Sequence, residues 1–159
     1  MSSVSTKKMS RFVPGSEDFS YEDFPFYWLA MVHLTYTQKL ERILKRLGTD
    51  IPGRRVLLML DRHGTLSVSE LAKHVIIKLP TLTRVIHRMR NEGLVETSTN
   101  AEDARITDVS ITVAGKELLA RIHQASERVF QVAYQGLNGA QIERLNDTLA
   151  VIYRNFGEM

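Results

Sequence analysis

The segment 67–112 combines two short helical patterns with two stretches of strand periodicity, in that order. Ser67 and Glu70 have the spacing of a capping box, which starts the first helix. The second helix covers about Lys78 to Asn91, and its apolar stripe consists of Leu82, Val85, Ile86 and Met89. Beyond Gly93, apolar and polar residues alternate as they do in strands. A helix, a turn, a helix and a hairpin make the winged variant of a helix-turn-helix unit.

The N-terminal part of the chain predicts an arm followed by two helices. Residues 1–22 are rich in serine, charge and isolated glycine or proline, a composition that predicts a flexible arm. Asp23 has the position of a cap for a long helix that includes Pro25 in its first turn and stops at Gly48. A shorter helix follows Pro52 and leads into the segment 67–112.

Two further helices are predicted after the hairpin, the first capped by Thr112 and the second started by Asn138 with Gln141. A winged unit of about sixty residues cannot cover the apolar stripes of three long helices, so a second chain is expected to bury them. The predicted fold is mainly α with a small β-hairpin wing. Its predicted parts are a flexible arm (1–22), a helical dimerisation region (23–48 and 113–159) and a winged helix-turn-helix DNA-binding domain (49–112).

Several classes of function are excluded or disfavoured by what the chain lacks. Cysteine is absent, which excludes disulfides, thiolate catalysis and cysteine-ligated zinc. The histidines are scattered without the i, i+4 spacing of a helical metal site, so a metal site is not expected. We expect no other cofactor. A glycine-rich phosphate loop and a nucleophile elbow are missing, so an enzyme is not expected. No segment reaches the ~18 uncharged apolar residues that span a bilayer, and we expect a soluble, cytoplasmic protein.

The helix at 78–91 has a basic face without an obvious partner in the chain. Thr81, Arg84 and Arg88 share one line on it, with Thr83, His87 and Arg90 beside them. Between Arg62 and Glu92 the cations outnumber the anions, as phosphate binding requires. Because a helix fits a major groove about 12 Å wide, this face predicts DNA binding. The alternative is a solvated charged face.

The chemistry of each side chain suggests its role. Lys78 and Thr81 stand at the N-terminal end of this helix, where backbone N–H groups can also face phosphates. Arg84 can reach a base edge and has the shape for bidentate contact with guanine. Near the hairpin tip, Arg105 can enter the minor groove, and Asp103 would orient it through a charge-assisted hydrogen bond. The alternative for the tip is an acid and a base that merely offset each other for solubility.

Three runs of residues carry motifs that occur together. The first is LSVSELAKHVIIKLPTLTRVIHRMRNEGLVE, and the second is the wing EDARITDVSIT with its Asp-x-Arg motif. The third is VAGKELL at the start of the next helix. Together they resemble the MarR family of bacterial transcription regulators, with its helix-turn-helix, its Asp-x-Arg wing and its Leu/Ile-Thr-x-x-Gly start of the fifth helix. The resemblance covers Asp50 to Leu119, and the flanking helices match by length and order.

The resemblance implies a homodimer in which the first, fifth and sixth helices interlock and the two winged units sit on a pseudo-palindromic operator. It also implies repression that a small aromatic or phenolic ligand relieves. By position, it assigns two groups of DNA-binding residues. The recognition helix contributes Lys78, Pro80, Thr81, Thr83, Arg84 and Arg88, and the wing contributes Asp103 and Arg105.

Two positions depart from the family pattern. Val75, Ile76 and Ile77 occupy the turn in which family members usually carry a glycine or a small polar residue. Pro80 stands where a small residue such as serine is common. The operator sequence therefore cannot be carried over from the family. The absence of cysteine also excludes the peroxide-sensing mechanism of some relatives.

Aromatic residues of the first long helix predict a ligand site. Trp28, His33 and Tyr36 lie near the place where this helix should meet the winged unit, and Arg54 and Arg55 can bind a carboxylate there. The alternatives are core and dimer packing for the rings and a DNA phosphate for the arginines. We expect a sequence-specific homodimeric repressor released by a small aromatic ligand. The alternatives are a winged-helix protein-interaction module and a non-specific architectural DNA-binding protein.

Overall fold

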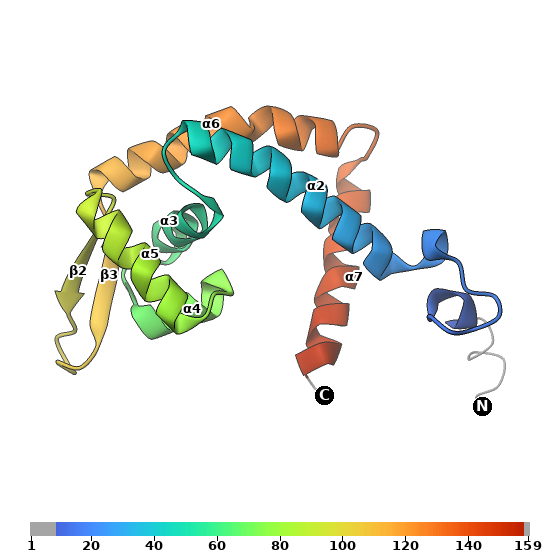
Figure 1. The fold of residues 1–159 in the computed structure, drawn as a ribbon, viewed down its shortest axis with the longest axis horizontal. Helices are drawn as coiled ribbons and strands as arrows, with labels where there is room; N and C mark the ends of the chain where they lie inside the picture. Colours follow the sequence, from blue (N-terminus) through green and yellow to red (C-terminus); the bar gives the residue numbers. More distant parts are fainter. Residues whose placement is uncertain (1–8, 158–159) are drawn as a thin grey trace.

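The computed structural model describes residues 9–157, which form mainly helices and one small sheet (Figure 1). The helices are α2 (Pro25–Arg46), α3 (Ile51–His63), α4 (Val68–Val75), α5 (Leu79–Asn91), α6 (Val113–Ala133) and α7 (Gly139–Gly157). The strands are β1 (Leu66–Ser67), β2 (Val95–Thr99) and β3 (Thr107–Ile111). The predicted class, mainly α with a β wing, is confirmed.

Two long helices, α2 and α6, run together along one side of the molecule (Figure 1). The short helices α3, α4 and α5 and the sheet gather under one end of this pair, and α7 descends from the other end. The core joins the first group to the long helices. Its fully buried members include Leu44 of α2, Leu57 of α3, Leu82 and Met89 of α5, and Ile122 of α6. Burying each such side chain contributes about 1.5–3 kcal/mol, which fixes the winged unit to α2 and α6.

Three of the predicted helix starts have the expected caps. The Ser67 side chain accepts from the Glu70 N–H at 3.3 Å, and Glu70 accepts from the Ser67 N–H at 3.0 Å, which completes a capping box. Thr112 caps α6, its hydroxyl oxygen accepting from the Gly115 N–H at 3.0 Å. Asn138 and Gln141 exchange two similar bonds of 2.9 and 3.0 Å at the start of α7.

The predicted cap of the first long helix is wrong. Asp23 lies in a 3-10 turn, Tyr21–Asp23, and its N–H donates to the carbonyl of Ser20 at 3.1 Å. Phe24 is the cap residue of α2 and makes no side-chain capping bond. Pro25 does occupy the first turn, as expected, and because it has no N–H the first turn needs one acceptor fewer.

The sheet has one strand more than the predicted hairpin. β2 and β3 pair antiparallel with Thr97 opposite Val109, as the alternation indicated. β1 pairs with the other edge of β3 and brings Leu66 opposite Val109. With only two residues, β1 is too short to show a periodicity in the sequence.

Residues 9–24 contain more structure than their composition predicts. Two 3-10 turns, Ser10–Phe12 and Tyr21–Asp23, precede α2. The ring of Phe19 lies edge-on to that of Phe24, with 5.6 Å between centroids. Aromatic contacts of this kind stabilise a local turn. The serine and charge content of the segment does not predict them. Residues 1–8 of the predicted arm lie outside the described residues.

The turn between α4 and α5 has an unusual backbone. Ile76 has a φ of 55°, the positive region that β-branched residues rarely adopt, and its side chain is 80 % exposed. This conformation costs about 1–2 kcal/mol. The left-handed residue ends α4 and allows α5 to begin at Leu79, the task that a glycine usually performs in such a turn.

Candidate nucleic-acid interface

The inner face of α5 is buried in the core, so its outer face is exposed. All four residues of the predicted apolar stripe are buried. The predicted DNA-binding residues of this segment lie on the other side and are exposed: Lys78, Pro80, Thr81, Thr83, Arg84 and Arg88. The polar line read from the sequence is therefore a surface of the folded chain.

Arg84 is available for a ligand outside the chain. Its exposed side chain makes no hydrogen bond or ion pair with any of residues 9–157. Lys78 is the cap residue of α5, and its exposed ammonium group is likewise unpaired within this range. The hydroxyl of Thr83 differs, because it donates to the carbonyl of Leu79 at 3.0 Å. Lys78 and Arg84 are therefore two exposed cations near the N-terminal half of α5 without a partner among the described residues.

Arg88 is engaged within the chain. Its Nη1 and Nη2 donate to the two carboxylate oxygens of Asp50 at 2.8 and 2.9 Å. Partial burial raises the pKa of Asp50, but the hydrogen bonds from Arg88 and from the Gly53 N–H outweigh this effect, so the pKa lies below its ordinary value. The Nε of Arg88 also lies 3.7 Å from Glu92. On the exposed face of α5, Arg84 is therefore unpaired among the described residues, whereas Arg88 is held by Asp50 and Glu92.

The wing presents one arginine in a fixed orientation. Arg105 donates from Nε and Nη2 to the carboxylate of Asp103 at 3.0 and 2.8 Å, and this pair lowers the pKa of Asp103. The side-chain oxygen of Asn100 accepts from the N–H groups of Glu102 and Asp103, which shapes the loop. The Arg105 side chain remains 89 % exposed. The charge-assisted hydrogen bonds expected between Asp103 and Arg105 are therefore present, while the contact of Arg105 with DNA stays a prediction.

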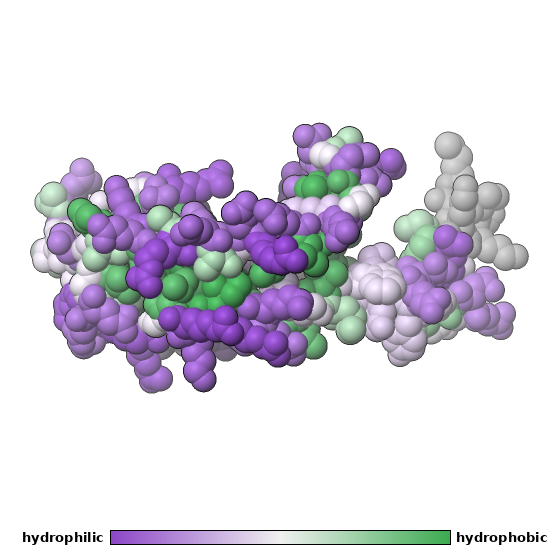
Figure 2. Space-filling view, turned by 90° about the horizontal axis from the view of Figure 1, so that it is seen from above, coloured by the Kyte–Doolittle hydropathy of each residue, from purple (hydrophilic) through white to green (hydrophobic). Residues whose placement is uncertain are grey.

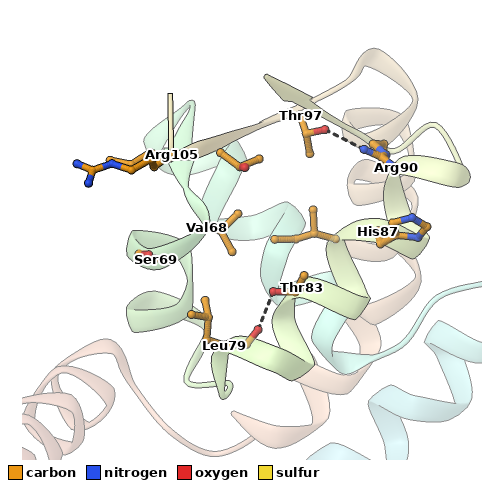
Figure 3. A pocket seen from close by; sticks show the side chains of 11 residues that line it. Val68, Ser69, Leu79, Thr83, His87, Arg90, Thr97 and Arg105 are labelled. Atoms are coloured by element: carbon orange, nitrogen blue, oxygen red, sulfur yellow. Dashed lines mark hydrogen bonds between the residues drawn. The ribbon is translucent and has the colours of Figure 1, made fainter. Parts of the chain in front are cut away.

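A hollow of about 350 Å³ separates α5 from the wing (Figure 3). Thr83 and His87 line it from α5, Thr97 lines it from β2, and the guanidinium of Arg105 points away from it. Arg90 closes one side by donating to the Thr97 hydroxyl at 3.4 Å. Sequence reasoning missed Thr97, although it shares a sheet face with buried Val95 because strand residues alternate.

The predicted ligand residues do not all come together within one chain. Trp28 is in the first turn of α2, and its indole N–H donates to the carbonyl of Glu22 at 2.8 Å. Leu44, which packs on the core beside α3, is sixteen residues further along α2, a rise of about 24 Å. Arg54 belongs to α3, so Trp28 and Arg54 do not share a cavity in the described chain.

The remaining ligand residues have separate surroundings. His33 is exposed on α2, and the half-buried ring of Tyr36 lies 6.1 Å from that of Phe130 in α6. Arg55 donates to the carbonyl of Val75 at 3.3 Å and so ties α3 to the end of α4. The Nε of Arg54 is buried and has no hydrogen-bond partner among the described residues.

Two features that other classes of protein need are absent from residues 9–157. These residues contain no cluster of three or more histidine, aspartate or glutamate side chains able to hold a metal ion. None of their helices combines the length and apolar content needed to cross a bilayer.

Comparison with known proteins assigns the family. The MarR family pattern matches residues 54–107. Over 153 residues, the chain is 44 % identical to the HTH-type transcriptional repressor IacR of Pseudomonas putida, covering 96 % of this chain and 92 % of that protein. The chain belongs to the MarR family. It is a DNA-binding transcriptional regulator and not an enzyme, and the resemblance of its winged unit to this family is confirmed.

Solved structures show that the fold extends over most of the chain. A mutant of MarR from E. coli complexed with operator DNA has a TM-score of 0.73 and 24 % identity, covering 83 % of this chain and 96 % of that one. NadR in complex with 4-hydroxyphenylacetate also has a TM-score of 0.73, with 21 % identity and coverage of 88 % and 97 %. The helices that flank the MarR winged unit are therefore part of the shared fold.

Proposed function

We propose that this MarR-family chain is a homodimeric, sequence-specific repressor that binds a pseudo-palindromic operator and is released by an aromatic ligand. The observation that carries the proposal is that the chain exposes two guanidinium groups. Arg84 on α5 has no partner among residues 9–157, and Arg105 on the wing is exposed and held in orientation by Asp103. A recognition helix and a wing that each present a guanidinium group can contact adjacent grooves of one duplex. The name of the IacR repressor supports the direction of regulation.

Each predicted DNA-binding residue other than Arg88 has a proposed part. Arg84 reads a base edge in the major groove, while Lys78 and Thr81 contact phosphates at the N-terminal end of α5. Pro80 and Thr83 shape this end of the helix, since Pro80 is in its first turn and Thr83 bonds back to Leu79. Arg105, held by Asp103, enters the minor groove.

The proposed homodimer is supported by apolar surface that one chain leaves uncovered. In α7 no residue of the described chain is buried, although Ile142, Leu149 and Ile152 repeat at helical spacing. Val132 near the end of α6 is 55 % exposed. Figure 2, which views the side formed by α2 and α6, shows a band of apolar side chains between polar ones. A second chain would bury these faces and set two α5 helices about 34 Å apart, one turn of DNA.

Replacing Arg84 with alanine is expected to weaken operator binding by about 1–3 kcal/mol and to relax the preference at one base pair per half-site. Fluorescence anisotropy with the operator, its point variants and random DNA measures both effects. Arg121→Ala, which removes an exposed arginine of α6, is the matched control and should bind normally. Equal losses on operator and random DNA would show that Arg84 contacts only phosphate. Indifference of the unaltered protein to sequence would instead favour an architectural or protein-binding role.

The proposed ligand is an aromatic carboxylic acid. NadR was solved with 4-hydroxyphenylacetate, and in this chain the buried, unpartnered Nε of Arg54 is a donor suited to a carboxylate. Arg55 lies next in sequence, and Tyr36, His33 and Trp28 offer rings along α2. Because Trp28 lies at the far end of α2 from the part that packs on α3, which carries Arg54, we propose that the second chain completes this site.

An aromatic acid at 100 times its dissociation constant is expected to stabilise the protein by about 2.7 kcal/mol. Thermal denaturation with 4-hydroxyphenylacetate and related acids measures this gain. The corresponding amides are the controls, because they keep the ring and lose the charge. Arg54→Gln should remove the response to the acids. If no acid of a broad panel raises the melting temperature, the ligand proposal is contradicted. The DNA-binding proposal is not affected by that result.

A further inference from the structure

We propose that Arg88 is a positioning residue that locks α5 to the N-terminus of α3 through Asp50, and that it does not read DNA. This inference rests on the proposed function of α5 as the recognition helix. It also separates Arg88 from Arg84, which lies one turn earlier on the same exposed face. The two arginines differ in their partners, and the partners decide what each can do.

The donors of Arg88 are already used within the chain. Both terminal nitrogens lie within 2.9 Å of the Asp50 carboxylate in a bidentate arrangement, and Nε faces Glu92. Bidentate contact with guanine requires the same pair of donors that Asp50 occupies. The charges agree with this role, since the carboxylates of Asp50 and Glu92 already offset the positive charge of Arg88 and weaken its attraction for a phosphate.

Asp50 connects α5 to the junction between the long helix α2 and the winged unit. It follows the end of α2 by four residues and is the N-cap of α3. Its Oδ1 accepts from the Gly53 N–H at 2.8 Å as well as from Arg88. One carboxylate therefore fixes the start of α3 and the side of α5 at the same time, which defines the orientation of α5 relative to the α2–α3 junction.

Gly53 packs closely against this carboxylate and against its arginine partner. Gly53 is buried, and a Cβ added there would lie 2.7 Å from Thr49 Oγ1 and 3.1 Å from Asp50 Oδ1. The same Cβ would lie 3.6 Å from Arg88 Nη2. Because half-exposed ion pairs contribute little to global stability, the main effect of this one is geometric. A recognition helix must hold its side chains close to the productive geometry to read bases.

Lysine at position 88 distinguishes a residue that positions α5 from one that contacts a phosphate. Arg88→Lys keeps the charge needed for a phosphate contact but loses the bidentate fork that holds Asp50. If Arg88 positions α5, operator affinity falls about tenfold, comparable to losing one charge-assisted hydrogen bond, while affinity for random DNA and the salt dependence stay unchanged. Arg84→Lys is the matched comparison, because that residue has no partner to lose within residues 9–157.

Asparagine at position 50 tests the pair from its other side. Asp50→Asn keeps a cap for α3, since asparagine is as good a cap as aspartate, but removes the charge that holds Arg88. The expected loss of operator affinity is again about tenfold, and the double variant Asp50→Asn/Arg88→Lys should lose no more than either single variant. Melting temperatures of all three variants should remain close to that of the unaltered protein.

Three results would overturn the inference. One is Arg88→Lys binding the operator normally while Arg88→Ala lowers the salt slope by about 0.9 per contact, the mark of a phosphate contact. The second is tighter binding by Asp50→Asn, which would mean that Asp50 merely competes with DNA for Arg88. The third is additive losses in the double variant. Failure of the unaltered protein to prefer any sequence would contradict the proposed function instead, so the two failures are distinguishable.

Discussion

Replacing Leu145 with aspartate in α7 is expected to convert the protein to monomers and to lower operator affinity by about 100-fold or more, because one recognition helix alone retains half of the contacts. Leu145 is 52 % exposed in the single chain and belongs to the apolar stripe of α7. In a dimer this face is buried, and burying an unpaired carboxylate costs several kcal/mol. Analytical ultracentrifugation measures the assembly, and anisotropy with the operator measures the affinity.

Ala150→Asp is the control for this experiment. Ala150 is exposed on α7 and lies well round the helix from the stripe of Leu145, Leu149 and Ile152, so it receives the same charge outside the proposed contact. This variant should remain dimeric and bind the operator. If Leu145→Asp also stays dimeric, the exposed apolar face of α7 does not form the interface, and another face must pair the two winged units.

The parts of the fold that depend on near neighbours in sequence could be predicted from the sequence. Ser67 with Glu70 and Asn138 with Gln141 are three residues apart, and each pair caps its helix as expected. The same holds at the wing tip, where Asp103 and Arg105 are two residues apart and form the expected charge-assisted bonds. Over such short separations the backbone geometry alone brings the partners together.

Interactions across distant segments could not be predicted in the same way. Asp50 and Arg88 are 38 residues apart in the sequence, and the pattern of α5 alone made Arg88 equivalent to Arg84. Only the packing of α5 against α3 shows that one arginine is held and the other is unpaired. β1 and the separation of Trp28 from Arg54 were missed for the same reason, because both follow from how whole elements pack.

The close approach of α6 to the start of the wing depends on a glycine. A Cβ added at Gly115 would lie 2.2 Å from the carbonyl oxygen of Leu94 and 2.8 Å from Cγ1 of Ile111. Thr112 holds the same junction, because its hydroxyl donates to the carbonyl of Gly93 at 2.7 Å and its N–H donates to that of Leu94 at 3.2 Å. This geometry gives a physical reason for glycine at this position of the VAGKELL run.

Gly115→Ala is therefore expected to lower the free energy of unfolding by about 3 kcal/mol, since a backbone carbonyl cannot move aside as a flexible side chain can. The melting temperature should fall by about 6–12 °C, and chemical denaturation measures the free energy directly. Gly139→Ala at the start of α7 is the matched control, because a Cβ there has no neighbour within 4 Å. The control should be neutral or slightly stabilising, as alanine restricts the unfolded chain. Equal stability of the two variants would contradict the packing of α6 against Leu94, and with it the fixed angle between the wing and the long helices.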